Sequence, residues 1–98
     1  MLEEYFGKQI RDIIGDNPER AQEILGKLRL INNSEEWKFF RNVIKSVREE
    51  VIKNFEKSPV NQELLIAYQQ SLAALDFLLE LPSALIATIE LEYNLTTE

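Results

Sequence analysis

The chain has 98 residues, of which 45% are apolar and 29% are charged, and its formal net charge is −6. This length suits one small domain with a modest core, and the composition is neither that of a disordered tail nor that of a membrane protein. Cys and His are both absent, which excludes disulfides, zinc sites with Cys or His ligands, cysteine nucleophiles and Ser-His-Asp triads. The acidic balance argues against nonspecific coating of nucleic acid.

The sequence carries no pattern typical of secretion or membrane insertion. Its first residues, Met-Leu-Glu-Glu-Tyr, are acidic and polar, whereas a secretory signal starts with basic residues and an apolar run. The longest apolar stretch, residues 72–91, is interrupted by Asp76, Glu80, Pro82 and Glu90. We therefore expect a cytoplasmic protein that does not contact membranes.

Two short helices are predicted at the N-terminus. Apolar residues recur at spacings of three and four between Leu2 and Ile14, as on one face of an amphipathic helix. Asn17 is a suitable N-cap for a second helix that begins at Pro18 and extends to about Ile31.

Two longer helices are predicted to follow, and each carries apolar residues at heptad spacing. The third begins after Asn33 and Ser34 and extends to about Lys57, and the fourth runs from about Asn61 to Leu81. The connector is short, which predicts an antiparallel hairpin. The predicted seams are Trp37, Phe40, Ile44, Val47 and Val51 on the third helix and Leu65, Tyr68, Leu72, Leu75 and Leu79 on the fourth.

The last residues allow two conformations. Pro82 is expected to end or kink the fourth helix, and Ser83 is placed to cap a further turn or two that runs through Ile89. From Ile89 to Leu95, however, apolar and polar residues alternate, which is typical of a half-buried strand.

The predicted fold is therefore all-α. Two short N-terminal helices pack on a long antiparallel helical hairpin, and a short C-terminal helix or extended tail follows. The chain is predicted to form a single domain, with the short helices in residues 1–32, the hairpin in 33–81 and the tail in 82–98.

Apolar residues of the C-terminal half extend beyond one seam. Residues 58–98 contain six acidic residues and no Lys or Arg, and one hairpin partner cannot cover a helix that is apolar on more than one side. Either the N-terminal helices cover the excess, or a second copy or another protein does. The candidate oligomer interface consists of Leu64, Phe77, Leu78, Leu81, Ile89, Leu91 and Tyr93.

Four basic residues form a second candidate surface on the third helix. Lys38, Arg41, Lys45 and Arg48 follow each other at spacings of three, four and three, which aligns them along one stripe. This basic ridge has the charge to contact nucleic-acid phosphates or the acidic half of a neighbouring copy. It also fits a solvated face that binds nothing.

No catalytic, metal or cofactor site is predicted. Asp76 and Glu80 share a helix face, but dinuclear-metal bundles combine such carboxylates with His ligands, which this chain lacks. Gly7-Lys8 and Gly26-Lys27 are not followed by Ser or Thr and have no upstream Gly at the required spacing, so a phosphate-binding loop is not indicated.

Four segments between residues 20 and 86 resemble a known class of proteins. They are Arg20–Leu25, Glu35–Phe40, Lys57–Val60 and Leu78–Pro82. Their succession is similar to that in small all-helical proteins of tailed bacteriophages, which are often encoded among head and portal genes. The resemblance implies a non-enzymatic virion or assembly component that self-associates or docks on a larger complex. The alternative is a small regulator that contacts nucleic acid, or a nucleic-acid enzyme, through the basic ridge.

Overall fold

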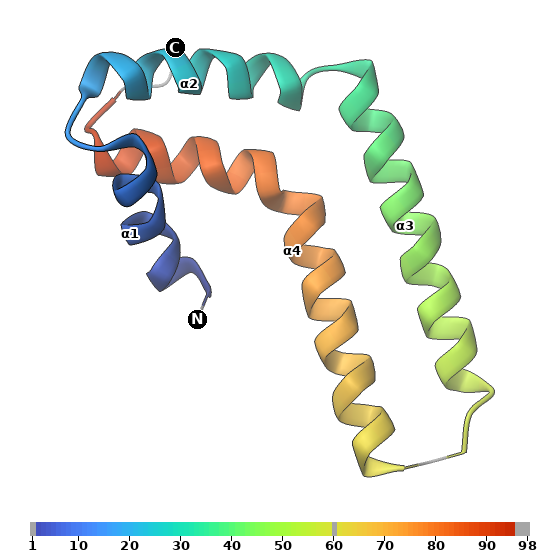
Figure 1. Cartoon of the computed structure of the whole chain (residues 1–98). Coiled ribbons are helices and arrows are strands. Elements are labelled where there is room, and N and C mark those ends of the chain that lie inside the picture. Colours follow the sequence, from blue (N-terminus) through green and yellow to red (C-terminus); the bar gives the residue numbers. More distant parts are fainter. Residues whose placement is uncertain (1, 60, 96–98) are drawn as a thin grey trace. The chain divides into compact units, whose positions relative to one another are not determined.

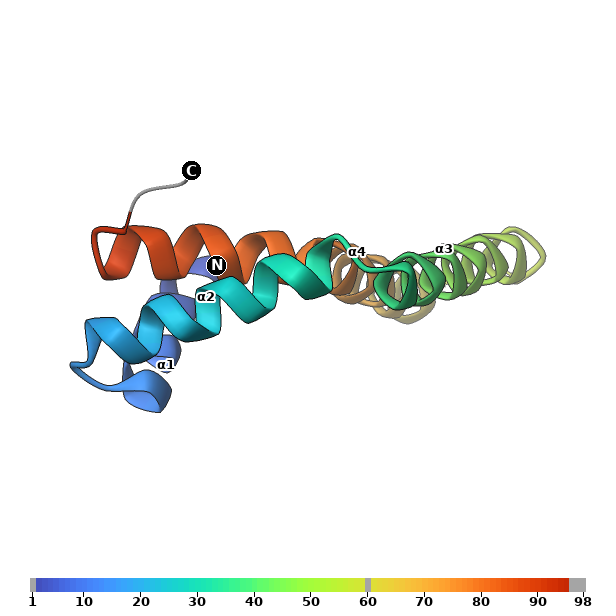
Figure 2. The same ribbon diagram turned by 90° about the horizontal axis from the view of Figure 1, so that it is seen from above.

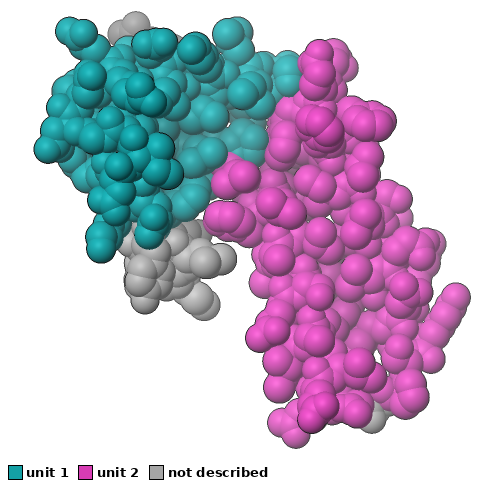
Figure 3. All heavy atoms as spheres, viewed as in Figure 1, with its two compact units in different colours: residues 1–34, 82–98 teal, residues 35–81 magenta. Residues whose placement is uncertain are grey.

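The structure, a computed structural model, describes the backbone of residues 2–59 and 61–95 and the side chains from Phe6 onward within these ranges. Over these ranges it contains four helices and no strand: α1 (Leu2–Ile14), α2 (Pro18–Asn32), α3 (Glu35–Glu56) and α4 (Gln62–Glu92) (Figure 1). The all-α prediction is confirmed. The chain divides into two compact units, drawn in Figure 3: unit 1 comprises residues 1–34 and 82–98, and unit 2 comprises residues 35–81.

Local signals set the break between α1 and α2. Gly15 has a φ of +81°, a left-handed conformation that glycine adopts without the steric cost of a Cβ atom. Two residues later the Asn17 side chain accepts a hydrogen bond from the Arg20 backbone N–H at 3.1 Å, and Pro18 opens the helix. The predicted cap is confirmed because the interactions that define it lie within a few residues of sequence.

The C-terminal half of α4 decides between the alternatives for the last residues. Pro82 lies inside α4, so the expected end of the fourth helix near Leu81 is wrong, and the helix continues to Glu92. Ile89 to Glu92 are therefore helical, and of the two conformations allowed from Ile89 onward the strand is wrong. Helical spacing places Leu85, Ile86 and Ile89 on one side of α4, where they pack in a core. This packing selects the helix over the strand, although Pro82 removes one backbone donor.

A hydrogen-bonded cap ends α4. Asn94 adopts a left-handed φ of +52°, and the Leu95 N–H donates to the Glu90 carbonyl at 2.9 Å. The Asn94 N–H donates to the Leu91 carbonyl at 3.4 Å, which completes the pair of bonds of a Schellman motif. Asn at this position ends the helix in the way that Gly more often does.

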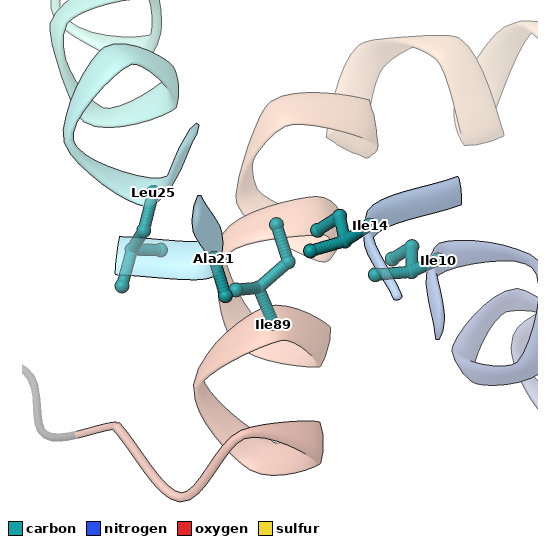
Figure 4. Close-up of a cluster of buried hydrophobic side chains, with 5 residues drawn as sticks. All are labelled: Ile10, Ile14, Ala21, Leu25 and Ile89. Atoms are coloured by element: carbon teal, nitrogen blue, oxygen red, sulfur yellow. The ribbon is translucent and has the colours of Figure 1, made fainter. Parts of the chain in front are cut away.

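Unit 1 contains the core. α2 and the last part of α4 lie side by side in both Figure 1 and Figure 2, and α1 contributes a third set of apolar side chains. Burial of each large apolar side chain contributes about 1.5–3 kcal/mol to stability. The buried side chains of this core, drawn in Figure 4, are Ile10 and Ile14 from α1, Ala21 and Leu25 from α2, and Ile89 from α4.

Unit 2 has no comparable core. None of its described residues is buried, and α3, all of which is described, has no buried residue. Contacts between α3 and the first part of α4 include a pair of aromatic rings and an ion pair. The Phe55 and Tyr68 rings stack with centroids 4.0 Å apart, and Arg48 Nε lies 2.8 Å from the Asp76 carboxylate.

Candidate interaction surface

The predicted seam of α3 is only partly covered: Trp37, Ile44 and Val51 are half-buried, and the other two residues are exposed. Phe40 and Val47 are 56% and 46% exposed, whereas Arg41 and Arg48 are half-buried. Arg can occupy such positions because its aliphatic stem packs on apolar neighbours while its guanidinium reaches a polar group, here Asp76 for Arg48. The half-buried residues of α3 are Trp37, Arg41, Ile44, Arg48, Val51, Ile52 and Phe55.

A line of exposed apolar residues runs along α3 beside its contact side. Phe40, Val43 and Val47 follow at spacings of three and four, and each is 46–56% exposed. Phe39 lies at the edge of this line, 65% exposed, and its ring meets that of Phe40 edge to face at 6.1 Å. The predicted seam places Phe40 and Val47 in the hairpin interior and does not include Val43.

A second line runs along α4. Of the residues in the predicted seam of α4, Tyr68, Leu72, Leu75 and Leu79 are half-buried, while Leu65 is exposed. Beside this seam lies another heptad line whose central residues are small. Its members are Leu64, Ala67, Ser71, Ala74, Leu78 and Leu81, at spacings of 3, 4, 3, 4 and 3, and all except the half-buried Leu81 are exposed.

The sequence predicts only part of this second line. Leu64, Leu78 and Leu81 belong to the predicted oligomer interface, whereas the small residues Ala67, Ser71 and Ala74 between them do not. Their heptad spacing with the three leucines would have indicated that they share the same face.

Ion pairs within the chain involve part of the basic ridge. Lys38 Nζ lies 3.2 Å from the Glu35 carboxylate, and Arg48 pairs with Asp76. Arg41 is half-buried, and its Nε is enclosed with no hydrogen-bond partner among the described residues. Lys45 is exposed. The four residues therefore do not form a uniform row of exposed cations.

The other candidate interface residues lie in different environments. Phe77 is half-buried, and Leu91 is 76% exposed on unit 1. Ile89 is only 1% exposed because α1 and α2 cover it, which corrects the expectation that it lies on an open surface. Tyr93 is half-buried, and its hydroxyl donates to the Gly15 carbonyl at 2.6 Å.

Unit 1 has a small charged pocket of about 210 Å³ near the end of α4. Arg11 pairs there with Glu92 at 2.8 Å and with Asp16 at 3.3 Å, and it lies over the Tyr93 ring. The hydrogen bond that Arg11 donates to the Glu92 carboxylate raises the pKa of Arg11 above its ordinary value, so this side chain stays charged at every pH near neutrality. Arg11 also donates to the Glu92 backbone carbonyl. These contacts link α1 to the end of α4, so the charged residues of the pocket have a structural role. Its lining is Arg11, Asp16, Pro18, Glu92, Tyr93 and Asn94.

Two further features bear on function. Among the described residues, no group of three or more acidic, His or Cys side chains is placed to hold a metal ion. α4 is long and apolar enough to cross a membrane by length and composition alone, and little of its most apolar window is buried.

Comparison of the chain with protein-family models, with curated proteins and with solved structures gives no match.

Proposed function

We propose that α3 and residues 62–81 of α4 form an antiparallel helical hairpin with one apolar face. The Phe55–Tyr68 and Arg48–Asp76 contacts support this arrangement, because the α4 residue number rises as the α3 number falls. We name as the apolar face Phe40, Val43 and Val47 of α3 together with Leu64, Ala67, Ser71, Ala74 and Leu78 of α4.

Helix geometry supports a shared face. Successive residues of a helix are rotated by about 100° around its axis. On each helix, the exposed apolar line is therefore rotated by roughly 90–110° from the side that contacts the other helix. Viewed along each helix from its first residue, this rotation is anticlockwise in both. Because the two helices run in opposite directions, offsets of the same sense place both lines on the same side of the pair. The other side carries the Arg48–Asp76 ion pair and Lys45.

From this face we infer a non-enzymatic helical assembly protein that binds a protein partner, either another copy or a larger complex. The observation that carries the proposal is the exposure of the apolar face, since a water-soluble monomer rarely leaves a continuous patch of this kind uncovered. The resemblance to phage head and portal proteins supports a role as a virion or assembly component in the host cytoplasm. We propose a water-soluble protein as the partner, in preference to a membrane, because the charged residues Asp76 and Glu80 interrupt the apolar sequence of α4.

The regulator alternative has less support. The ion pairs of Lys38 and Arg48 partly neutralise the basic ridge, and the charged residues in the adjoining part of α4 are all acidic. Phosphate recognition depends on several unpaired cations that act together.

Site-specific photocrosslinking in cells that produce the protein tests this function. A photoreactive residue at Val47, on the apolar face, should form protein adducts of defined mass. The control is the same residue at Asn42, which is also exposed on α3 but lies away from the apolar face. Absence of protein adducts from Val47, or an identical adduct pattern from both positions, would show that the apolar face binds no protein.

A further inference from the structure

The apolar face has the size and the charge pattern of a surface that pairs with itself. We propose that its occupant is a second copy of this chain, and that two hairpins pack face to face about a two-fold axis parallel to the helices. In the resulting four-helix bundle, α3 of one copy lies over α4 of the other. This inference rests on the proposed function and specifies the partner of the same surface.

The available area is sufficient for a stable dimer. A helix of about 20 residues is about 30 Å long, and two packed helices present a face about 20 Å wide. Each copy therefore contributes about 600 Å², and together they bury about 1,200 Å², the lower bound for a specific interface. Unit 2 is also the part of the chain in which no described residue is buried, so a second hairpin would supply the missing half of a core.

Charge favours pairing α3 with α4 over pairing like helices. Residues 35–57 carry six basic and five acidic groups, whereas residues 58–81 carry three acidic groups, Glu63, Asp76 and Glu80, and no basic group. Two α4 segments placed over each other would bring six acidic groups together, whereas α3 over α4 places each acidic α4 segment over a segment with six basic and five acidic groups and keeps the two α4 segments apart.

The register within one copy fixes the register between copies. The Phe55–Tyr68 and Arg48–Asp76 contacts place Val47 level with about residue 77 of α4. A two-fold axis parallel to the helices keeps residues of both copies at the same height. The bulky residues Val43 and Val47 then face the partner's Leu78, while the polar Glu50 lies near the partner's small Ala74.

Sedimentation velocity on the purified full-length chain tests the second copy. The wild type should be a dimer at micromolar concentration, and Val43→Glu combined with Leu78→Glu should weaken dimerisation at least tenfold. Asn42→Glu adds one negative charge, next to Val43 but off the apolar face, and it should leave dimerisation unchanged. Circular dichroism of each variant reports whether the helices persist. Equal weakening by Asn42→Glu and by the double variant would overturn the proposal.

Crosslinking tests the pairing, and the absence of native Cys makes it specific. Under mild oxidation, a mixture of Val47→Cys and Leu78→Cys chains should form the mixed disulfide, whereas Lys45→Cys should form none with either. If Val47→Cys chains crosslink preferentially with each other, α3 lies over α3 and the proposed pairing is wrong.

A wild-type chain that stays monomeric at high micromolar concentration would also overturn the inference. In that case, protein adducts of another mass from Val47 in cells would leave the proposed function standing. Flotation of the monomer with neutral lipid vesicles, without any such adducts, would contradict both and indicate a membrane.

Discussion

The Tyr93 hydroxyl donates a hydrogen bond of 2.6 Å to the carbonyl oxygen of Gly15, joining the end of α4 to the turn between α1 and α2. These residues are 78 positions apart in the sequence. Gly15 occupies a left-handed conformation, with a φ of +81°, and Arg11 lies over the same Tyr93 ring. A single side chain therefore helps to hold the turn against α4.

We expect Tyr93→Phe to destabilise unit 1 by about 0.5–1.5 kcal/mol, because the Gly15 carbonyl loses its donor while the ring stays in place. Urea denaturation followed by circular dichroism measures this change. Tyr68→Phe is the control, since the structure shows ring stacking but no hydrogen bond for this side chain among the described residues. Equal losses from the two variants would mean that the Tyr93 hydroxyl adds nothing specific.

The two glycines inside helices should respond differently to alanine. At Gly26 a Cβ atom would meet nothing within 4 Å, so Gly26→Ala should stabilise the protein by about 0.5–1 kcal/mol through helix propensity. At Gly7 a Cβ atom would lie 2.5 Å from Glu92 Oε1. The other oxygen of this carboxylate pairs with Arg11, which holds the carboxylate in place. Gly7→Ala should therefore give a smaller gain or a loss, and thermal melting of both variants compares them.

If Gly7→Ala stabilised the chain as much as Gly26→Ala, α1 would not approach the end of α4 at Gly7. Adding Glu92→Ala to Gly7→Ala removes the obstructing carboxylate. The alanine at position 7 should then recover most of the helix-propensity gain, measured against Glu92→Ala alone.

Interactions within a few residues of sequence explain which boundaries could be predicted. The N-cap at Asn17 and the start of α2 at Pro18 depend on neighbouring residues, and the structure places both as predicted. The continuation of α4 from Pro82 to Glu92 could not be obtained in this way. It depends on packing of Ile89 against α1 and α2, and the alternation of apolar and polar residues from Ile89 onward fits a strand equally well when that packing is unknown.

The candidate surface was predicted only in part because heptad spacing on α3 is ambiguous. Phe40 and Val47 fall at seam spacing with Trp37 and Ile44, but they also align with Val43 on a neighbouring line. Hydrophobicity alone assigns the line with more apolar residues to the interior. The structure instead turns Arg48 toward α4, where Asp76 accepts its guanidinium, and no local pattern indicates that long-range pair.

A double-mutant cycle tests the contact between the two helices of unit 2. Stacked aromatic pairs contribute about 0.5–1.5 kcal/mol beyond the apolar area that they bury, so Phe55→Ala and Tyr68→Ala should show a coupling energy of that size in urea denaturation. The control cycle pairs Phe55→Ala with Leu91→Ala, because Leu91 lies in unit 1 and is exposed. The losses in unfolding free energy from these two substitutions should be additive. Additive losses in both cycles would contradict the stacking of Phe55 on Tyr68.

The basic ridge should contribute little to folding. Replacing Lys38, Arg41, Lys45 and Arg48 together with Gln removes the exposed Lys38–Glu35 pair and the partly exposed Arg48–Asp76 pair, and solvent-accessible pairs contribute about 0–1 kcal/mol each. The melting temperature should therefore stay close to that of the wild type. Nucleic-acid binding by the wild type, measured by fluorescence anisotropy at physiological salt, should be weak; tight binding that the four substitutions abolish would favour the regulator alternative.

The last prediction compares Ile89 with Leu91, two residues apart on α4. In a strand, residues i and i+2 share a face, so both side chains would be covered to a similar extent. In a helix they are separated by about 200°, and the structure accordingly buries Ile89 at 1% exposure and leaves Leu91 at 76%.

Ile89→Val should therefore cost about 0.5–1.5 kcal/mol and Ile89→Ala about 2–5 kcal/mol, because the core contracts only partly around the cavity. Leu91→Ala should change the free energy of unfolding by less than about 0.5 kcal/mol. Urea denaturation of the three variants measures these values, and Ile89→Val keeps the comparison available if Ile89→Ala does not fold. Similar losses from Ile89→Ala and Leu91→Ala would restore the strand interpretation, whereas a large difference places Ile89 in the core that α4 shares with α1 and α2.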